Sequence, residues 1–314
     1  IYNAFLTGKR PATYLFITLL GAFLLMLSLG ISPIVAIGGA VAVAFCSYNM
    51  QIIQVGHNTK MMAIAWLPWV LAAVIFTYRT ALSMFRVNAD ESPKSTSWKS
   101  WLPQTVLGAS LFGMALNFQI KANHIQISYY LAIIIFCYAI GLFIWLVADK
   151  ERRHGIAKFF AASALLLTIG IIGIGANANK LIPTYNYSKH TMRGGSELAD
   201  GSSENSGKTK GLDLEYATAW SYGWQELPNM MIPDFNGGAS SGAVNYSKSE
   251  TIKLLKQYGQ PNLREVAKTL PLYWGPQPFT AGPMYMGAIT IFLFILGLFM
   301  CKGRDKWWIL AATV

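Results

Sequence analysis

Two pairs of basic and titratable residues are the clearest chemical feature of the sequence. His57 and Lys60 are three residues apart, and so are Lys121 and His124 in the reverse order. On helical backbone, residues three apart share one face, so we expect each pair to act together. Lysine supplies a point charge, and histidine donates a hydrogen bond or changes protonation near neutral pH. This combination suits a phosphate group.

The flanking asparagines add amide donors to both pairs. We therefore predict a lipid-phosphate-binding site made of His57, Asn58, Lys60, Lys121, Asn123 and His124. The alternative is that these basic side chains only extend toward lipid headgroups or complement a helix C-terminus.

A metal site is not predicted from the histidines. The four histidines show neither HxxxH nor HExxH spacing, and zinc needs three or four close ligands. A divalent metal held by loop carboxylates is left open, and no other cofactor is evident.

The composition requires elements that cross a membrane. Of the 314 residues, 54% are hydrophobic and 12% charged, against roughly 25% charged in soluble domains. Seven stretches lack Asp, Glu, Lys and Arg, and each is long enough to cross a bilayer as a helix. They are residues 12–30, 31–48, 61–78, 101–120, 125–148, 159–179 and 281–301, the first two separated at Gly30-Ile31-Ser32-Pro33.

The predicted fold class is an all-α integral membrane protein, a polytopic helical bundle of seven full spans with a truncated eighth and one long exoplasmic loop. Helices 1–6 occupy residues 1–178, the loop or small subdomain occupies 179–280, and helix 7 with the start of helix 8 occupies 281–314. We expect further helices on either side of this chain.

The distribution of Lys and Arg predicts the orientation, because short cytoplasmic loops carry the excess. One set of alternate short loops contains eleven of these residues and the opposite set four. The set of eleven is predicted to be cytoplasmic, which places both histidine–lysine pairs and the long loop on the exoplasmic face. The net charge of +11 is then partly a topology signal, and nucleic acid is not an expected partner.

The long loop combines a flexible tether with aromatic and acidic residues. Residues 194–211 are rich in Gly and Ser and are predicted to be mobile. Aromatic rings beside polar groups suit sugars, although Trp and Tyr also form interfacial belts. Candidate sugar or acceptor contacts are Trp220, Tyr222, Trp224 and Trp274, and candidate catalytic carboxylates are Asp213, Glu226 and Asp234, for which solvated or capping roles are the alternative.

Smaller patterns predict local structure. Residues 247–258 resemble a short amphipathic helix, with Ser247 and Glu250 as a capping box and Gly259 closing it. The Gly-rich run from Gly170 to Gly175 lies inside a predicted span, where close helix packing explains it. Asn186-Tyr187-Ser188 and Asn245-Tyr246-Ser247 match the glycosylation sequon.

Four segments carry a family resemblance. GHNTKMMAIAWLPWVLA (56–72), NHIQISYYL (123–131), WSYGWQELPNMMIPDFNGG (220–238) and LYWGPQPFTAGPMYMGAI (272–289) resemble the YfhO-type bacterial membrane proteins, in the form common in the Bacteroidetes. That family is similar to glycosyltransferases of the C-type fold. The resemblance implies a multi-pass protein of the bacterial cytoplasmic membrane, with an exoplasmic active site.

The function implied is transfer of a sugar from a polyprenyl-phosphate carrier to a cell-envelope acceptor. Such transferases usually place a catalytic Asp or Glu in the first exoplasmic loop, whereas residues 1–11 contain no acid, so no catalytic residue is assigned by resemblance. The alternatives are a transporter or flippase of a lipid-linked or anionic solute, and a non-catalytic membrane scaffold.

Overall fold

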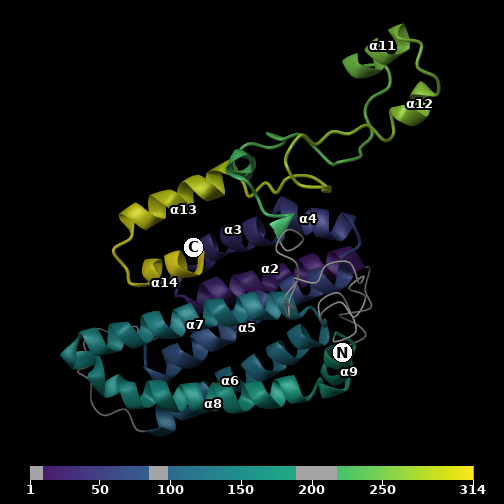
Figure 1. The fold of residues 1–314 in the computed structure, drawn as a ribbon. Helices are drawn as coiled ribbons and strands as arrows, with labels where there is room; N and C mark the ends of the chain where they lie inside the picture. The colour runs from purple at the N-terminus through teal and green to yellow at the C-terminus, as the bar shows by residue number, and fades with distance from the viewer. Residues whose placement is uncertain (1–9, 85–97, 189–217, 314) are drawn as a thin grey trace, which may run out of the picture. The chain divides into compact units, whose positions relative to one another are not determined.

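The structure is a computed structural model that describes residues 10–84, 98–188 and 218–313 (Figure 1). These residues form helices joined by turns, and no β-strand occurs among them. Two compact units can be distinguished by their internal contacts. Unit 1 comprises residues 1–45, 56–186 and 296–314, and unit 2 comprises residues 46–55 and 187–295.

Unit 1 is a bundle of long helices. Its elements are α2 (Arg10–Ser28), α3 (Pro33–Ala44), α5 (Asn58–Ala81), α6 (Trp98–Lys121), α7 (Ile125–Ala148), the 3₁₀ helix η1 (Lys150–Gly155), α8 (Ile156–Gly175), most of α9 (Ala178–Ser188) and α14 (Asp305–Thr313). Helix α5 is central, because it packs most extensively against α6 and α2 and also contacts α7 and α8 (Figure 1). Its small and apolar side chains are buried over most of its length.

Within the described parts of the chain, five segments are long and apolar enough to cross a membrane: Pro11–Ser28, Pro33–Gln54, Asn58–Ala81, Ile125–Ala148 and Lys150–Gly175. The molecule is therefore consistent with a helical, multi-pass membrane protein. Helix α6 is 24 residues long, as α5 is, but it is more polar, with Gln104, Asn117 and Gln119 along it. The full count of seven spans stays a prediction.

The predicted break between the first two segments is confirmed. Gly30 has a φ of 85°, a left-handed conformation that glycine adopts without strain. Pro33 is the first residue of α3, where its missing N–H costs no helical hydrogen bond.

Two of the predicted continuous segments are wrong in their bounds. Residues 31–48 do not form one helix, because α3 ends at Ala44 and α4 begins at Ser47 after Phe45 and Cys46. Residues 281–301 are helical only as α13 (Ala288–Met300). Pro283 and two left-handed glycines, Gly282 and Gly287, keep the preceding residues out of a helix.

Close packing of α6 against α8 confirms the interpretation of the Gly-rich run. A Cβ added to Gly173 would lie 3.0 Å from the carbonyl oxygen of Gly113, and one added to Gly113 would lie 2.4 Å from Ile169 Cγ2. The two backbones can approach this closely only because neither glycine carries a side chain.

Unit 2 contains shorter elements: α4 (Ser47–Gln54), the 3₁₀ helix η2 (Trp224–Met230), α11 (Glu250–Gln257), α12 (Leu263–Val266) and most of α13. The amphipathic helix is confirmed, and Gly259 follows it with a φ of 71°. Its predicted cap is wrong. Ser249, not Ser247, accepts the hydrogen bond from Ile252 N, because Ser247 is already engaged with the side chain of Asn245.

Candidate functional site

The two predicted basic pairs lie at one end of unit 1. Helices α5 and α6 are antiparallel, as shown by Trp66 stacking on Phe118 near one end and Thr80 meeting Thr105 near the other. The start of α5 therefore meets the end of α6. Since α7 begins four residues after α6 ends, His57, Lys60, Lys121 and His124 share this end, which we call the basic end.

Hydrogen bonds between helix termini fix the backbone of the basic end. The Tyr14 hydroxyl of α2 donates to Asn58 Oδ1 of α5 at 3.3 Å. Asn177, just after α8, donates to Asn117 Oδ1 of α6 at 2.8 Å. These contacts join four helices at a position where each has unsatisfied backbone groups.

Helix α9 covers part of the basic end. Asn123 Nδ2 donates to Thr184 Oγ1 at 3.2 Å, and Lys180 Nζ donates to the Lys121 carbonyl at 3.3 Å. Lys180 is thus a third lysine at the basic end.

The two histidine–lysine pairs differ in how their residues are placed on the helices. His57 is the N-cap residue of α5 and is exposed, and the half-buried Lys60 follows in the first turn. Lys121 is the last residue of α6, whereas His124 precedes α7. The expectation that Lys121 and His124 share a helical face is wrong, because Asn123 adopts a φ of 56° and ends the helix between them.

The basic end contains positive charge without nearby acids in the sequence. Residues 10–14, 56–62, 117–128 and 173–188 contain Arg, Lys and His but no Asp or Glu. A concentration of one sign of charge at a low-dielectric boundary attracts counter-ions. The arrangement therefore favours an anionic group located at the ends of these helices.

In unit 2, Glu226 is the centre of a buried polar network. Its side chain has no exposed surface. It accepts hydrogen bonds from the Tyr273 hydroxyl, from Gly223 N at 3.2 Å and from Gln277 Nε2 at 3.4 Å. We call Glu226, Gly223, Tyr273 and Gln277 the Glu226 network.

Burial also shifts the tyrosines beside this carboxylate. Desolvation, and then the hydrogen bond to Glu226, raises the pKa of Tyr273 to about 12. Burial likewise raises the pKa of Tyr222. The hydrogen bond that its hydroxyl accepts from Met284 N at 2.9 Å lowers this pKa, but by less than burial raises it. Both hydroxyls are therefore protonated at neutral pH and serve as hydrogen-bonding groups.

The other two candidate acids differ from Glu226. Asp234 is exposed and has a φ of 54°, and its carbonyl accepts a hydrogen bond from Gly237 N at 2.8 Å in a tight turn. The turn is supported by buried Asn229, whose Nδ2 donates to Asn236 Oδ1 at 2.7 Å. Asp213 and the predicted tether 194–211 lie outside the described residues.

The four candidate aromatic contacts fall into two groups. Trp220 packs edge-on against Phe279 and donates to its carbonyl at 3.1 Å, and Tyr222 is held by Met284 N. In contrast, Trp224 and Trp274 are 88% and 68% exposed. Trp224 and Trp274 are therefore accessible to solvent, whereas Trp220 and Tyr222 are tied to the backbone of the loop.

Sequence reasoning missed several polar residues of both sites. Tyr273, Gln277 and Asn229 are single polar residues in aromatic segments, and no spacing rule links them to Glu226. Asn177 and Lys180 follow the Gly-rich span, and they reach Asn117 and Lys121 only because α8 packs parallel to α6. Among the described residues, no group of three or more His, Cys, Asp or Glu is close enough to hold a metal.

No protein-family model, curated protein or solved structure matches the chain.

Proposed function

We propose that this protein is a membrane glycosyltransferase that takes a sugar from a polyprenyl-phosphate carrier and transfers it to an exoplasmic acceptor of the cell envelope. The observation that carries the proposal is the basic end, where three lysines and two histidines gather at the boundary of an apolar helical bundle. The resemblance of four segments to YfhO-type proteins supports the same reading.

The basic end would hold the phosphate of the carrier. A lipid phosphate is anchored at the membrane boundary, so a receptor at helix ends meets it without burying charge in hydrocarbon. Lys60 and Lys121 supply positive charge, and His57, His124, Asn58 and Asn123 supply directed donors. This charge also stabilises the phosphate as it leaves.

The transfer step is an inverting substitution. An acceptor oxygen attacks the anomeric carbon while the bond from that carbon to the phosphate oxygen breaks, and the acceptor proton passes to a carboxylate. General-base catalysis of this kind contributes typically ~10²–10⁴ in rate. Of the candidate acids that the structure describes, Asp234 is exposed, whereas Glu226 is buried and hydrogen-bonded. Asp234 is therefore the first of the two to replace in a search for the base.

The test is sugar transfer by the full chain in vesicles that contain a radiolabelled polyprenyl-phosphate sugar and a membrane extract as acceptor. We expect Lys60→Ala with Lys121→Ala to abolish labelling while insertion is unchanged. Lys253→Ala with Lys268→Ala removes two lysines that pair with Glu250 and Glu265 in unit 2, and this matched control should retain labelling. Full activity without Lys60 and Lys121 would refute the phosphate assignment.

A transporter or flippase is the second candidate, favoured by the interruption of a membrane-length segment. Residues Pro33–Gln54 form one candidate span, yet the helix stops at Ala44 and restarts at Ser47. Carriers commonly use such discontinuous helices at their binding sites. Sugar-independent flux of a lipid-linked solute into proteoliposomes, without acceptor labelling, would support this candidate over the transferase.

A further inference from the structure

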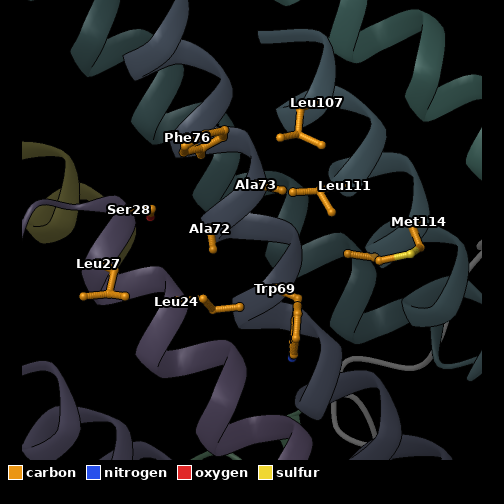
Figure 2. A pocket seen from close by; sticks show the side chains of 11 residues that line it. Leu24, Leu27, Ser28, Trp69, Ala72, Ala73, Phe76, Leu107, Leu111 and Met114 are labelled. Carbon is orange, nitrogen blue, oxygen red and sulfur yellow. The ribbon is translucent and has the colours of Figure 1, made fainter. Parts of the chain in front are cut away.

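A second feature of unit 1 lies away from the basic end, in the side of the bundle. A cavity of about 390 Å³ opens between α2, α5 and α6, within the range of volumes that hold small ligands. Figure 2 shows Leu24 and Leu27 of α2, Trp69 and Phe76 of α5, and Leu107, Leu111 and Met114 of α6 around it. We call it the lateral groove.

The lining of the lateral groove excludes a polar ligand. All of its side chains are apolar except Ser28 and the indole N–H of Trp69. The Ser28 hydroxyl donates to Leu25 O at 2.7 Å, and the Trp69 indole N–H donates to Ile17 O at 2.9 Å. Because both polar groups are satisfied within the protein, a ligand must gain its affinity from apolar contact.

The depth of the groove places it in hydrocarbon. From Trp69 to Phe76 it follows seven residues of α5, or about 10 Å of helix rise, within a candidate membrane span. Phe76 is three residues from Arg79, about 5 Å along the axis, whereas Trp69 is nine residues from Lys60, about 13 Å. The groove therefore lies closer to the Arg79 end of the bundle than to the basic end.

The guanidinium group of Arg79 lies beside the end of the lateral groove that is farther from the basic end. Arg79 Nη1 donates to the carbonyl oxygen of Ser28, a groove residue, at 2.9 Å. The guanidinium also lies over the turn after α2, since a Cβ added to Gly30 would be 3.0 Å from Arg79 Nη2. An anionic headgroup at this boundary would meet a cation that is delocalised and weakly hydrated.

From these observations we infer that the lateral groove binds one acyl chain of an anionic glycerophospholipid whose phosphate lies beside Arg79. The lipid belongs to the leaflet opposite the basic end, which the distribution of Lys and Arg predicts to be cytoplasmic. This site does not depend on the proposed transferase activity, because it lies near the other ends of the helices and uses none of the phosphate-binding residues.

The experiment uses the full chain in vesicles that contain phosphatidylglycerol with a photoreactive group on its acyl chain. After irradiation, cross-linked peptides are mapped by mass spectrometry. We expect labels to concentrate on residues 24–28, 69–76 and 107–115. Even labelling of all lipid-facing helices would overturn the proposal.

Matched variants test the groove itself. Leu111→Trp places a larger side chain into the groove from a half-exposed position and should reduce groove labelling several-fold, whereas Leu167→Trp on exposed α8 surface should not. Circular dichroism and gel filtration check folding, and Leu107→Phe replaces Leu111→Trp if that variant misfolds. Unchanged labelling in the folded groove variant would refute the site.

Two further labelling experiments test which lipid occupies the groove. Arg79→Gln should remove the preference for phosphatidylglycerol over phosphatidylcholine, whereas Arg153→Gln, which removes an arginine bonded to the Val147 carbonyl, should retain it. Addition of unlabelled polyprenyl phosphate should leave groove labelling unchanged. If polyprenyl phosphate displaces the label at low concentration, the occupant is the carrier chain and the phospholipid assignment is wrong.

Discussion

The hydroxyl group of Tyr273 donates a hydrogen bond to the carboxylate of Glu226, a side chain that has no exposed surface. The two residues are 47 positions apart, so their bond joins η2 to the segment that leads toward α13. Gly223 N and Gln277 Nε2 reach the same carboxylate. This buried acid, with its three hydrogen-bond donors, is the centre of a folded loop.

Removal of the Glu226 carboxylate should open this part of unit 2. Glu226→Ala leaves the half-buried donors of Tyr273 and Gly223 without this acceptor. Because a fully buried unsatisfied donor costs about 1–3 kcal/mol, we expect a cost toward the lower end of that range for each group. Hydrogen exchange at residues 223–230 and 273–277 should accelerate, while exchange in α5 stays unchanged. Glu226→Gln keeps one acceptor oxygen and should restore most of the protection. Equal protection in wild type and Glu226→Ala would contradict the structural role.

The raised pKa of Tyr273 predicts loss of stability in alkali. Its pKa in the folded protein is about 12, above the ordinary value of 10, so the unfolded state releases its proton first as pH rises. The stabilisation is fully present below pH 10 and is lost between pH 10 and about 12. Because Tyr222 also titrates late, the late part of the tyrosinate absorbance should fall by one tyrosine in Tyr273→Phe. It should stay unchanged in Tyr258→Phe, an exposed matched control.

The glycine contact between α6 and α8 gives a packing test. Gly173→Val forces a side chain against the Gly113 carbonyl, and overpacking of this kind costs typically about 1–3 kcal/mol. The melting temperature in detergent should fall. Gly175→Val is the matched control on the same helix, because nothing lies within 4 Å of an added Cβ there. A similar loss in both variants would point to helix propensity rather than to the α6–α8 contact.

Part of this architecture is readable from sequence because its causes are local. The charge-free stretches predict helices, and Gly30 with Pro33 predicts the break between α2 and α3, since each depends on the residue's own backbone preferences. The stop after Ala44 has no such signal. Neither Phe45 nor Cys46 has a backbone preference that ends a helix. The contact at the start of α4 is long-range, because the Ser47 hydroxyl donates to the Tyr285 carbonyl at 2.6 Å from 238 positions away.

The candidate sites show the same division. The sequence could predict that His57, Lys60, Lys121 and His124 lie near helix ends, because spacing and charge indicate where helices begin and end. Their neighbours Asn177 and Lys180 could not be identified, because only the packing of α8 beside α6 brings them there. Asn58 is likewise tied to Tyr14 by a bond between residues 44 positions apart. Long-range pairings of this kind depend on the whole bundle, which no single segment specifies.

The predicted orientation can be tested through a sequon in unit 2. Asn245 is exposed, and its side chain accepts hydrogen bonds from Ser247 N and Ser247 Oγ at 3.1 and 2.8 Å. If residues 179–280 are exoplasmic, translation into endoplasmic reticulum microsomes should place this segment in the lumen. Asn245 should then be glycosylated. In a chain whose other sequon is removed by Ser188→Ala, the gel shift should be abolished by Ser247→Ala.

The opposite loop supplies the control for that experiment. Asp149→Asn with Glu151→Ser creates a sequon between α7 and α8, in a loop with Lys150, Arg152 and Arg153 that the excess of basic residues predicts to be cytoplasmic. This engineered sequon should stay unmodified. Modification of the 149–151 sequon without modification of Asn245 would show that the true topology is the reverse of the predicted one. It would then place the basic end in the cytoplasmic leaflet, away from an exoplasmic acceptor, and the proposed transferase would have to be abandoned.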